Sequence, residues 1–265
     1  MGILANLTIV FIAGLITDLA TGIGAIPFFF KDDFSDLWLV GLWGLAAGIM
    51  TAASLFGLIP AGLNQGTVLQ VSIGLLTGVF LVVYASRKIG EYELEPGELN
   101  EADYKELILI LGILTVHSFP EGVAIGVSFA KMNLSTGIPI LGATIPLLAI
   151  IMTISISIHN IPEGISISIP FKSMDMSNSR MLGATIFSSV PQPIGAVLAY
   201  LFVSVAESFL PIGYGFAGGA MIFLVYSEFL EEAEEQGESL KDWRKPFLIG
   251  GAAGFLIMSP LIFII

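Results

Sequence analysis

The chain carries two near-copies of one polar motif within apolar sequence, His117-Ser118-Phe119-Pro120-Glu121-Gly122 and His159-Asn160-Ile161-Pro162-Glu163-Gly164. These HxxPEG blocks contain the only two histidines among 265 residues. Each block places an imidazole and a carboxylate four residues apart, so both project from one face of a helix. Because ionisable side chains are costly in hydrocarbon, a doubled His/Glu pair at membrane depth indicates a functional site.

The composition predicts an all-α integral membrane protein. Hydrophobic residues make up 55% of the chain, charged residues 12%, and the mean hydropathy is +0.91. These values are typical of a polytopic helical protein whose main partner is the lipid bilayer. The absence of cysteine excludes disulfides and thiolate metal sites. The net charge is −12, and most of the acidic residues fall in two predicted loops. The chain has no basic patch of the kind that binds nucleic acid.

Apolar stretches near the ~20 residues that span a bilayer predict eight transmembrane helices. We expect a single transmembrane transporter domain over residues 1–265, with an acidic cytoplasmic loop at 89–105 between the third and fourth spans. The first stretch has no basic n-region, so we interpret it as a retained helix rather than a signal peptide. The predicted spans are 4–30, 38–62, 67–87, 106–131, 139–170, 181–206, 212–231 and 246–265.

The basic residues predict the orientation in the cell membrane. With eight spans, nine of the ten lysines and arginines fall on one side, and only Lys131 falls on the other. The positive-inside rule makes the first side cytoplasmic, which places both termini on the extracytoplasmic side. The nine residues are Lys31, Arg87, Lys88, Lys105, Lys172, Arg180, Lys241, Arg244 and Lys245.

The two motifs lie at matching depth. At 1.5 Å per residue, His117 is about 16 Å from the cytoplasmic start of the fourth span, and Glu163 is about 12 Å from the cytoplasmic end of the fifth. Both depths fall near the middle of a hydrocarbon layer about 30 Å thick. The antiparallel spans can therefore bring His117, Glu121, His159 and Glu163 together. Two imidazoles and two carboxylates suit Zn²⁺, Fe²⁺, Mn²⁺, Co²⁺ or Cd²⁺ as a substrate, and no organic cofactor is indicated.

The motifs resemble those of the ZIP (Zrt/Irt-like protein) divalent-metal transporters, in particular the GufA/ZupT-like prokaryotic branch. Further segments are similar to that branch: residues 20–27 (ATGIGAIP), 188–195 (SSVPQPIG) and 217–228 (AGGAMIFLVYSE). The resemblance implies a 3+2+3 arrangement of eight helices with inverted repeats. It also implies that a bundle of spans 1, 4, 5 and 6 moves against spans 2, 3, 7 and 8.

The sequence departs from this family at a second metal position. By the resemblance, that position maps to Ser118, Asn160 and Gln192. Ser118 stands where many members have Asn, and Gln192 replaces the usual Glu. We therefore expect one tightly bound ion and at most a weak second one. The cytoplasmic loop also lacks the histidines of many members, and its acidic residues are interpreted as solvated or as a weak metal-collecting segment.

Other polar and small residues leave alternatives open. Asp18 either lines the pathway or pairs internally. Glu228 and Glu231 either receive the ion on exit or lie at the membrane interface. Glycine spacings permit close helix contact, either within one chain or across a homodimer. These spacings are Gly44/Gly48, Gly74/Gly78, Gly215/Gly219 and Gly250/Gly254.

Three function classes fit these observations. The first is an importer of Zn²⁺ or a similar ion. The alternative is an intramembrane metalloenzyme that uses the same His/Glu cluster, although the chain has no HExxH block, and four protein ligands leave little room for the open position that catalysis needs. The third is a metal sensor or scaffold, which the sequence disfavours because it has no soluble signalling domain.

Overall fold

The computed structural model describes residues 2–31, 34–90, 118–133, 137–140, 142–173 and 176–258. The predicted loop from residue 91 onward lies outside the described residues, as do residues 106–117 of the predicted span at 106–131, His117 among them. The preceding helix α4 continues to Gly90 and so includes the first two residues of the predicted 89–105 loop.

The described residues form long helices joined by short connections. Residues 118–128 are also helical. The elements are α1 (Ile3–Ile23), η1 (Ile26–Phe29), α2 (Asp36–Ala52), η2 (Ala53–Leu58), α3 (Ile59–Gln65), α4 (Val68–Gly90), β1 (Gly137–Ile140), β2 (Ala143–Pro146), α6 (Leu147–Ser173), α7 (Asn178–Ser188), α8 (Pro191–Val205), η3 (Glu207–Phe209), α9 (Leu210–Leu224), η4 (Val225–Phe229), α10 (Leu230–Gln236) and α11 (Arg244–Met258).

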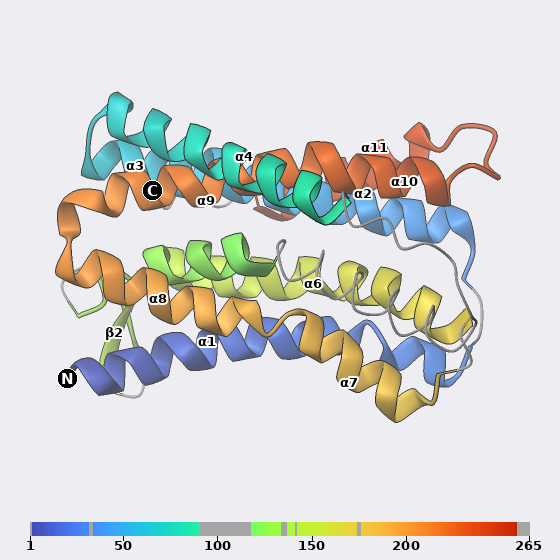
Figure 1. Cartoon of the computed structure of the whole chain (residues 1–265), viewed down its shortest axis with the longest axis horizontal. Coiled ribbons are helices and arrows are strands. Elements are labelled where there is room, and N and C mark those ends of the chain that lie inside the picture. The colour runs from blue at the N-terminus through green and yellow to red at the C-terminus, as the bar shows by residue number, and fades with distance from the viewer. Residues whose placement is uncertain are drawn as a thin grey trace.

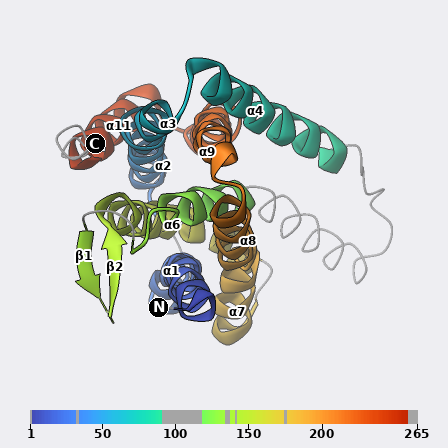
Figure 2. The same cartoon turned by 90° about the vertical axis from the view of Figure 1, so that its left-hand side faces the viewer.

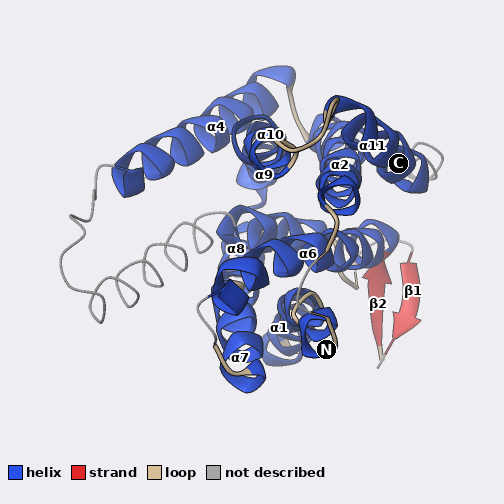
Figure 3. Cartoon of the chain, turned by 90° about the vertical axis from the view of Figure 1, so that its right-hand side faces the viewer, coloured by secondary structure: helices blue, strands red, loops and turns tan. Residues whose placement is uncertain are grey.

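The helices form two layers (Figures 1, 2 and 3). One layer contains α1, α6, α7, α8 and the helical residues 118–128, and the other contains α2, α3, α4, α9, α10 and α11. Six described stretches are long and apolar enough to cross a membrane, which agrees with a multi-pass membrane protein. They are Ile3–Phe29, Asp36–Gln65, Val68–Ala85, Leu147–Ile169, Asn178–Val205 and Glu207–Gln236.

Glycines bring α2 and α11 into backbone contact. A Cβ on Gly44 would lie 2.0 Å from the Phe247 carbonyl oxygen, and a Cβ on Gly48 would lie 2.1 Å from that of Gly251. The residue numbers rise together along both helices, so α2 and α11 run parallel. The pair Gly250 and Gly254 meets α2 carbonyls in return.

The same device joins α4 to α9. A Cβ on Gly74 would lie 2.2 Å from the Ile212 carbonyl oxygen, and a Cβ on Gly78 would lie 2.2 Å from that of Phe216. The pair Gly215 and Gly219 contacts α4 carbonyls in return. All four glycine spacings of the sequence therefore pack helices within one chain.

The two helix pairs run in opposite directions. A short turn at Gly66 and Thr67 reverses the chain between α3 and α4, so the pair α4/α9 is antiparallel to the pair α2/α11 (Figure 1). Two of the four helices also share an irregularity. A π-helical segment interrupts the stretch from α2 to α3 at η2 and the stretch from α9 to α10 at η4.

One expectation about a helix boundary was wrong. Residues 139–146 were predicted to begin a span, but β1 and β2 form an antiparallel hairpin there, and the helix starts at Leu147. The described chain is therefore not purely helical. A polar turn explains the difference: the Asn133 N–H donates to the Thr144 carbonyl, and the Asn133 side-chain oxygen accepts from the Thr144 N–H.

The predicted span at 181–206 agrees with the apolar stretch Asn178–Val205. It is divided, because α7 ends at Ser188 and α8 starts at Pro191.

Candidate metal centre

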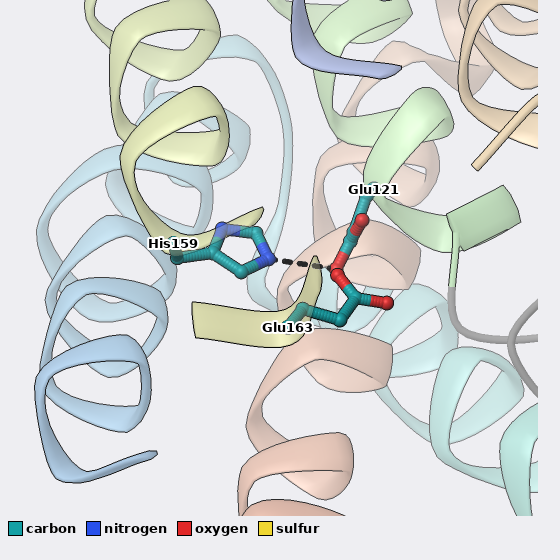
Figure 4. A group of neighbouring side chains, drawn as sticks. All are labelled: Glu121, His159 and Glu163. Atoms are coloured by element: carbon teal, nitrogen blue, oxygen red, sulfur yellow. Dashed lines mark hydrogen bonds and ion pairs between the residues drawn. The ribbon is translucent and has the colours of Figure 1, made fainter. Parts of the chain in front are cut away.

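Glu121, His159 and Glu163 form a buried group at the centre of their layer. One potential ligand atom from each lies within 4.8 Å of the other two, and all three residues are buried. Figure 4 shows the three side chains pointing toward one another. His159 Nε2 lies 2.9 Å from Glu121 Oε1. The predicted convergence of the two motifs is thus present for the three described members.

The HxxPEG pattern explains how these side chains meet. His159 and Glu163 lie one turn apart on the same face of α6, and Glu121 comes from the helical residues 118–128. The glycine that follows each glutamate allows another helix to approach. A Cβ on Gly122 would lie 2.3 Å from the Gln192 carbonyl oxygen, and a Cβ on Gly164 would lie 1.9 Å from that of Thr21.

Gln192 connects the centre to α8. Its Nε2 donates to Glu121 Oε2, and its Oε1 accepts from Asn160 Nδ2 at 3.0 Å. Asn160 Nδ2 also donates to the Thr17 carbonyl of α1 at 2.8 Å. Both amide side chains are fully buried. Two of the three residues at the suggested second position therefore join the hydrogen-bond network of the centre.

Ser118, the third of these residues, points elsewhere. It is buried, and its hydroxyl donates to the Ser188 carbonyl at 3.4 Å, at the end of α7. The connection between α7 and α8 is made of 3₁₀-type bonds, such as Ser189 N–H to Ile186 O and Gln192 N–H to Ser189 O. Pro191 and Pro193 have no N–H and cannot donate the helical bonds to residues 187 and 189.

The centre faces the other layer. The His159 ring lies 6.4 Å from the Phe229 ring of η4, which in turn lies 5.0 Å from the Trp43 ring of α2. Phe229 and Trp43 are buried and apolar. The three candidate ligands thus belong to one layer, whereas aromatic side chains of the other layer cover them.

Several predicted residues lie outside this group. Asp18 is buried on α1, Glu228 is partly buried in η4, and Glu231 is exposed on α10. Within the described ranges, Glu121, His159 and Glu163 form the one group of three or more His, Cys, Asp or Glu residues whose potential ligand atoms lie close enough together to hold a metal ion. The exit role of Glu228 and Glu231 therefore stays a prediction.

The donor set fits a borderline divalent cation. Two carboxylates supply a charge of −2, which a divalent ion balances, and an imidazole favours Zn²⁺ and its neighbours over the hard ions Ca²⁺ and Mg²⁺. Without a bound cation, the negative charge of the two buried carboxylates beside one imidazole would not be neutralised.

Comparisons with known proteins agree with this interpretation. The family model described as ZIP zinc transporter matches residues 95–262. The zinc transporter GufA of Myxococcus xanthus is 31% identical over 237 residues, which cover 85% of this chain and 89% of that protein. The zinc transporter ZIPB of Bordetella bronchiseptica is 33% identical over 231 residues, 81% of this chain and 68% of that protein.

A plant relative is considerably longer. A protein of Arabidopsis thaliana is 35% identical over 216 residues, which cover 81% of this chain and 33% of the plant protein. The match therefore spans about a third of the length of that relative.

Proposed function

The chain belongs to the ZIP zinc transporter family, and we propose that it carries a divalent transition-metal ion, Zn²⁺ first of all, across the cell membrane. The observation that supports this most directly is the buried cluster of Glu121, His159 and Glu163. His159 and Glu163 lie on a stretch that is long and apolar enough to cross a membrane. The relatives are named as transporters rather than enzymes, so the intramembrane metalloenzyme is not favoured.

The proposed transport site consists of Glu121, His159 and Glu163 together with His117. The second HxxPEG block has its histidine and glutamate on one face, and the first block has the same spacing. His117 would add a fourth ligand and complete a tetrahedral N₂O₂ set, a geometry that Zn²⁺ accepts readily.

The proposed architecture is the 3+2+3 arrangement of eight spans. The antiparallel helix pairs α2/α11 and α4/α9, with a π-helical segment at corresponding places in η2 and η4, support inverted repeats. The two spans not among the six long apolar helices are those predicted at 106–131 and 246–265. In this arrangement the layer that carries the metal centre moves against the layer that covers it.

The proposed orientation places both termini outside. The segments that join α1 to α2, α6 to α7 and α10 to α11 lie at one end of the molecule (Figure 1). Lys31 and Lys241 belong to two of these segments, and Lys172 lies in the last turn of α6. Because the chain has no cysteine, single-cysteine variants report orientation directly. In intact cells, an impermeant maleimide should label Lys131→Cys and leave Lys241→Cys unlabelled. The reverse pattern contradicts the orientation.

Metal uptake into proteoliposomes tests the proposed function. The purified protein should accumulate Zn²⁺, and parallel assays with Fe²⁺, Mn²⁺, Co²⁺ and Cd²⁺ give its preference. Glu121→Ala and Glu163→Ala should each lower uptake to near the level of empty vesicles, because the remaining ligands cannot balance the ion. Glu207→Ala is the matched control, since Glu207 is an exposed acid of η3. Near-normal uptake by either site variant, at equal reconstituted amount, rules out the site.

A further inference from the structure

Asp18 is a buried carboxylate that the metal centre does not use. It lies within the long α1 helix and is 2% exposed. Its Oδ1 has no hydrogen-bond partner among the described residues. An ionised carboxylate buried without a partner is strongly unfavourable, and at membrane depth such a group indicates a binding or transport role.

The contacts of α1 show what Asp18 faces. A Cβ on Gly14 would lie 2.6 Å from the Pro193 Cα, and a Cβ on Gly22 would lie 2.5 Å from the Ile186 Cγ1. Gly14, Asp18 and Gly22 are spaced by four residues and lie on one face of the helix. Asp18 therefore faces the chain between Ile186 and Pro193, which is the break between α7 and α8.

Oxygen atoms gather at this break. The Thr21 hydroxyl, one turn along α1 from Asp18, lies 2.8 Å from the Ser189 hydroxyl. The C-terminal end of α7 also presents carbonyl groups here, and the negative end of a helix dipole attracts cations. In addition, Asn160 reaches the same junction through its bond to the Thr17 carbonyl, and its Oδ1 has no partner within the described part of the chain.

We propose that Asp18 and the α7–α8 break bind a Na⁺ ion at a site separate from the divalent-metal centre. The donors are a carboxylate, hydroxyls and carbonyls, and oxygen-only sets favour hard cations. One carboxylate balances a single positive charge, which distinguishes this site from the centre with two carboxylates. Discontinuous helices whose half-helix C-terminal ends coordinate a coupling ion are a recurring feature of secondary transporters.

The hydrogen-bond network joins the two sites. Asn160 bonds both to the Thr17 carbonyl of α1 and to Gln192, and Gln192 bonds to Glu121. A cation that holds α1 against the α7–α8 break therefore also fixes the position of Glu121. The coupling of Na⁺ to metal uptake rests on the proposed function, whereas the binding of Na⁺ does not.

Thermal unfolding of the purified protein tests the binding. A ligand that binds the folded state raises the melting temperature in proportion to the logarithm of its concentration above the dissociation constant. Replacing choline chloride by NaCl at constant ionic strength should raise the melting temperature of the unmodified protein. The rise should be absent in Asp18→Asn, smaller in Ser189→Ala, and retained in Glu163→Gln. An equal rise with KCl, no rise with NaCl, or a full response in Asp18→Asn overturns the proposal.

Proteoliposomes test the coupling. An inward Na⁺ gradient should stimulate divalent-metal uptake severalfold in the unmodified protein. The same gradient should not stimulate uptake by Asp18→Asn. A melting response without stimulation of uptake overturns the coupling and retains the site. If no divalent metal is taken up under any condition, the proposed function fails, and the melting experiment still decides whether Na⁺ binds.

Discussion

Glu121 is the residue on which the neighbours of the centre converge. Its Oε1 faces the His159 imidazole at 2.9 Å, and its Oε2 accepts from the Gln192 amide. The Gln192 amide therefore occupies, through a hydrogen bond, the carboxylate oxygen that a second cation beside the first would need as a ligand. Because the amide is neutral, it offers that cation no compensating charge.

The first residue-scale prediction concerns stoichiometry. The unmodified protein should bind one divalent ion tightly per chain, because two such ions a few ångströms apart repel strongly and would share the same carboxylates. Gln192→Glu should strengthen a second position by at least tenfold, since it adds a charge and removes the donor to Glu121. Calorimetry with metal analysis of the purified protein measures both. Gln65→Glu, at an exposed position, is the control, and two equally tight ions in the unmodified protein contradict the prediction.

A second residue-scale prediction concerns pH. Metal ligation requires a neutral imidazole and ionised carboxylates, so protons compete with the ion for His159 and Glu163. The apparent affinity for Zn²⁺ should decline as the pH falls from about 8 to about 5, through the ordinary range of imidazole titration. Equilibrium binding on the purified protein, with free metal held constant by a buffer, gives the curve. An affinity that does not change over this range argues against imidazole ligation.

At the scale of elements, the sequence could predict the metal-binding faces but not the break that accompanies them. The spacing of His159 and Glu163 fixes their common face on α6 regardless of tertiary packing. Helix α6 continues through Pro162 of the second motif. The break lies instead before Pro191, where a second proline two residues later removes another backbone donor. The two prolines, Pro191 and Pro193, are visible in the sequence. Whether the break between α7 and α8 can bind a cation depends on oxygen atoms of neighbouring helices, which only the tertiary structure reveals.

The motif glycines carry the element-scale prediction. A side chain at Gly164 would meet the Thr21 carbonyl at 1.9 Å, and backbone cannot move aside as a side chain can. Gly164→Ala should therefore destabilise the protein by roughly 1–3 kcal/mol and separate α1 from α6. Gly183→Ala is the control, because a Cβ there meets nothing within 4 Å in the middle of α7.

Thermal melting in detergent distinguishes the two glycine variants. The control should be neutral or stabilised by about 0.5–1 kcal/mol, since alanine restricts the unfolded chain. A Gly164→Ala protein that melts together with Gly183→Ala would show that α1 and α6 do not pack as closely as the structure indicates.

At the scale of the whole molecule, hydropathy predicts a multi-pass membrane protein but not which layer each helix joins. The proposed inverted-repeat relation between the two antiparallel helix pairs is not evident in the sequence, because direct similarity between the halves is faint. The reciprocal contacts of glycines such as Gly44 and Gly74 with backbone carbonyls support it. Such contacts depend on small residues and helix direction, and few side-chain identities need to match between the two halves.

The two-layer structure leads to the last prediction, that uptake requires the layers to move against each other. A small cavity between α2 and α6 is lined by Leu42 from one layer and Ser166 from the other. In the cysteine-free chain, a short thiol cross-linker between Leu42→Cys and Ser166→Cys should abolish metal uptake. The matched pair Phe56→Cys and Phe255→Cys lies within one layer, where the two rings are 5.2 Å apart, and its cross-link should leave uptake largely intact.

The cross-linking assay needs one further comparison. Both pairs should support uptake before the cross-linker is added. Gel mobility after cleavage at a protease site engineered after Gly90, in the predicted cytoplasmic loop, reports how much of each pair has reacted. If the layers slide or rock, the loss of uptake follows the cross-linked fraction of the Leu42/Ser166 pair alone. Equal inhibition by both pairs indicates movement within a layer. Full uptake by a completely cross-linked Leu42/Ser166 pair indicates a path through a fixed interface, because a covalent bridge across the layers prevents the centre from moving past Trp43 and Phe229.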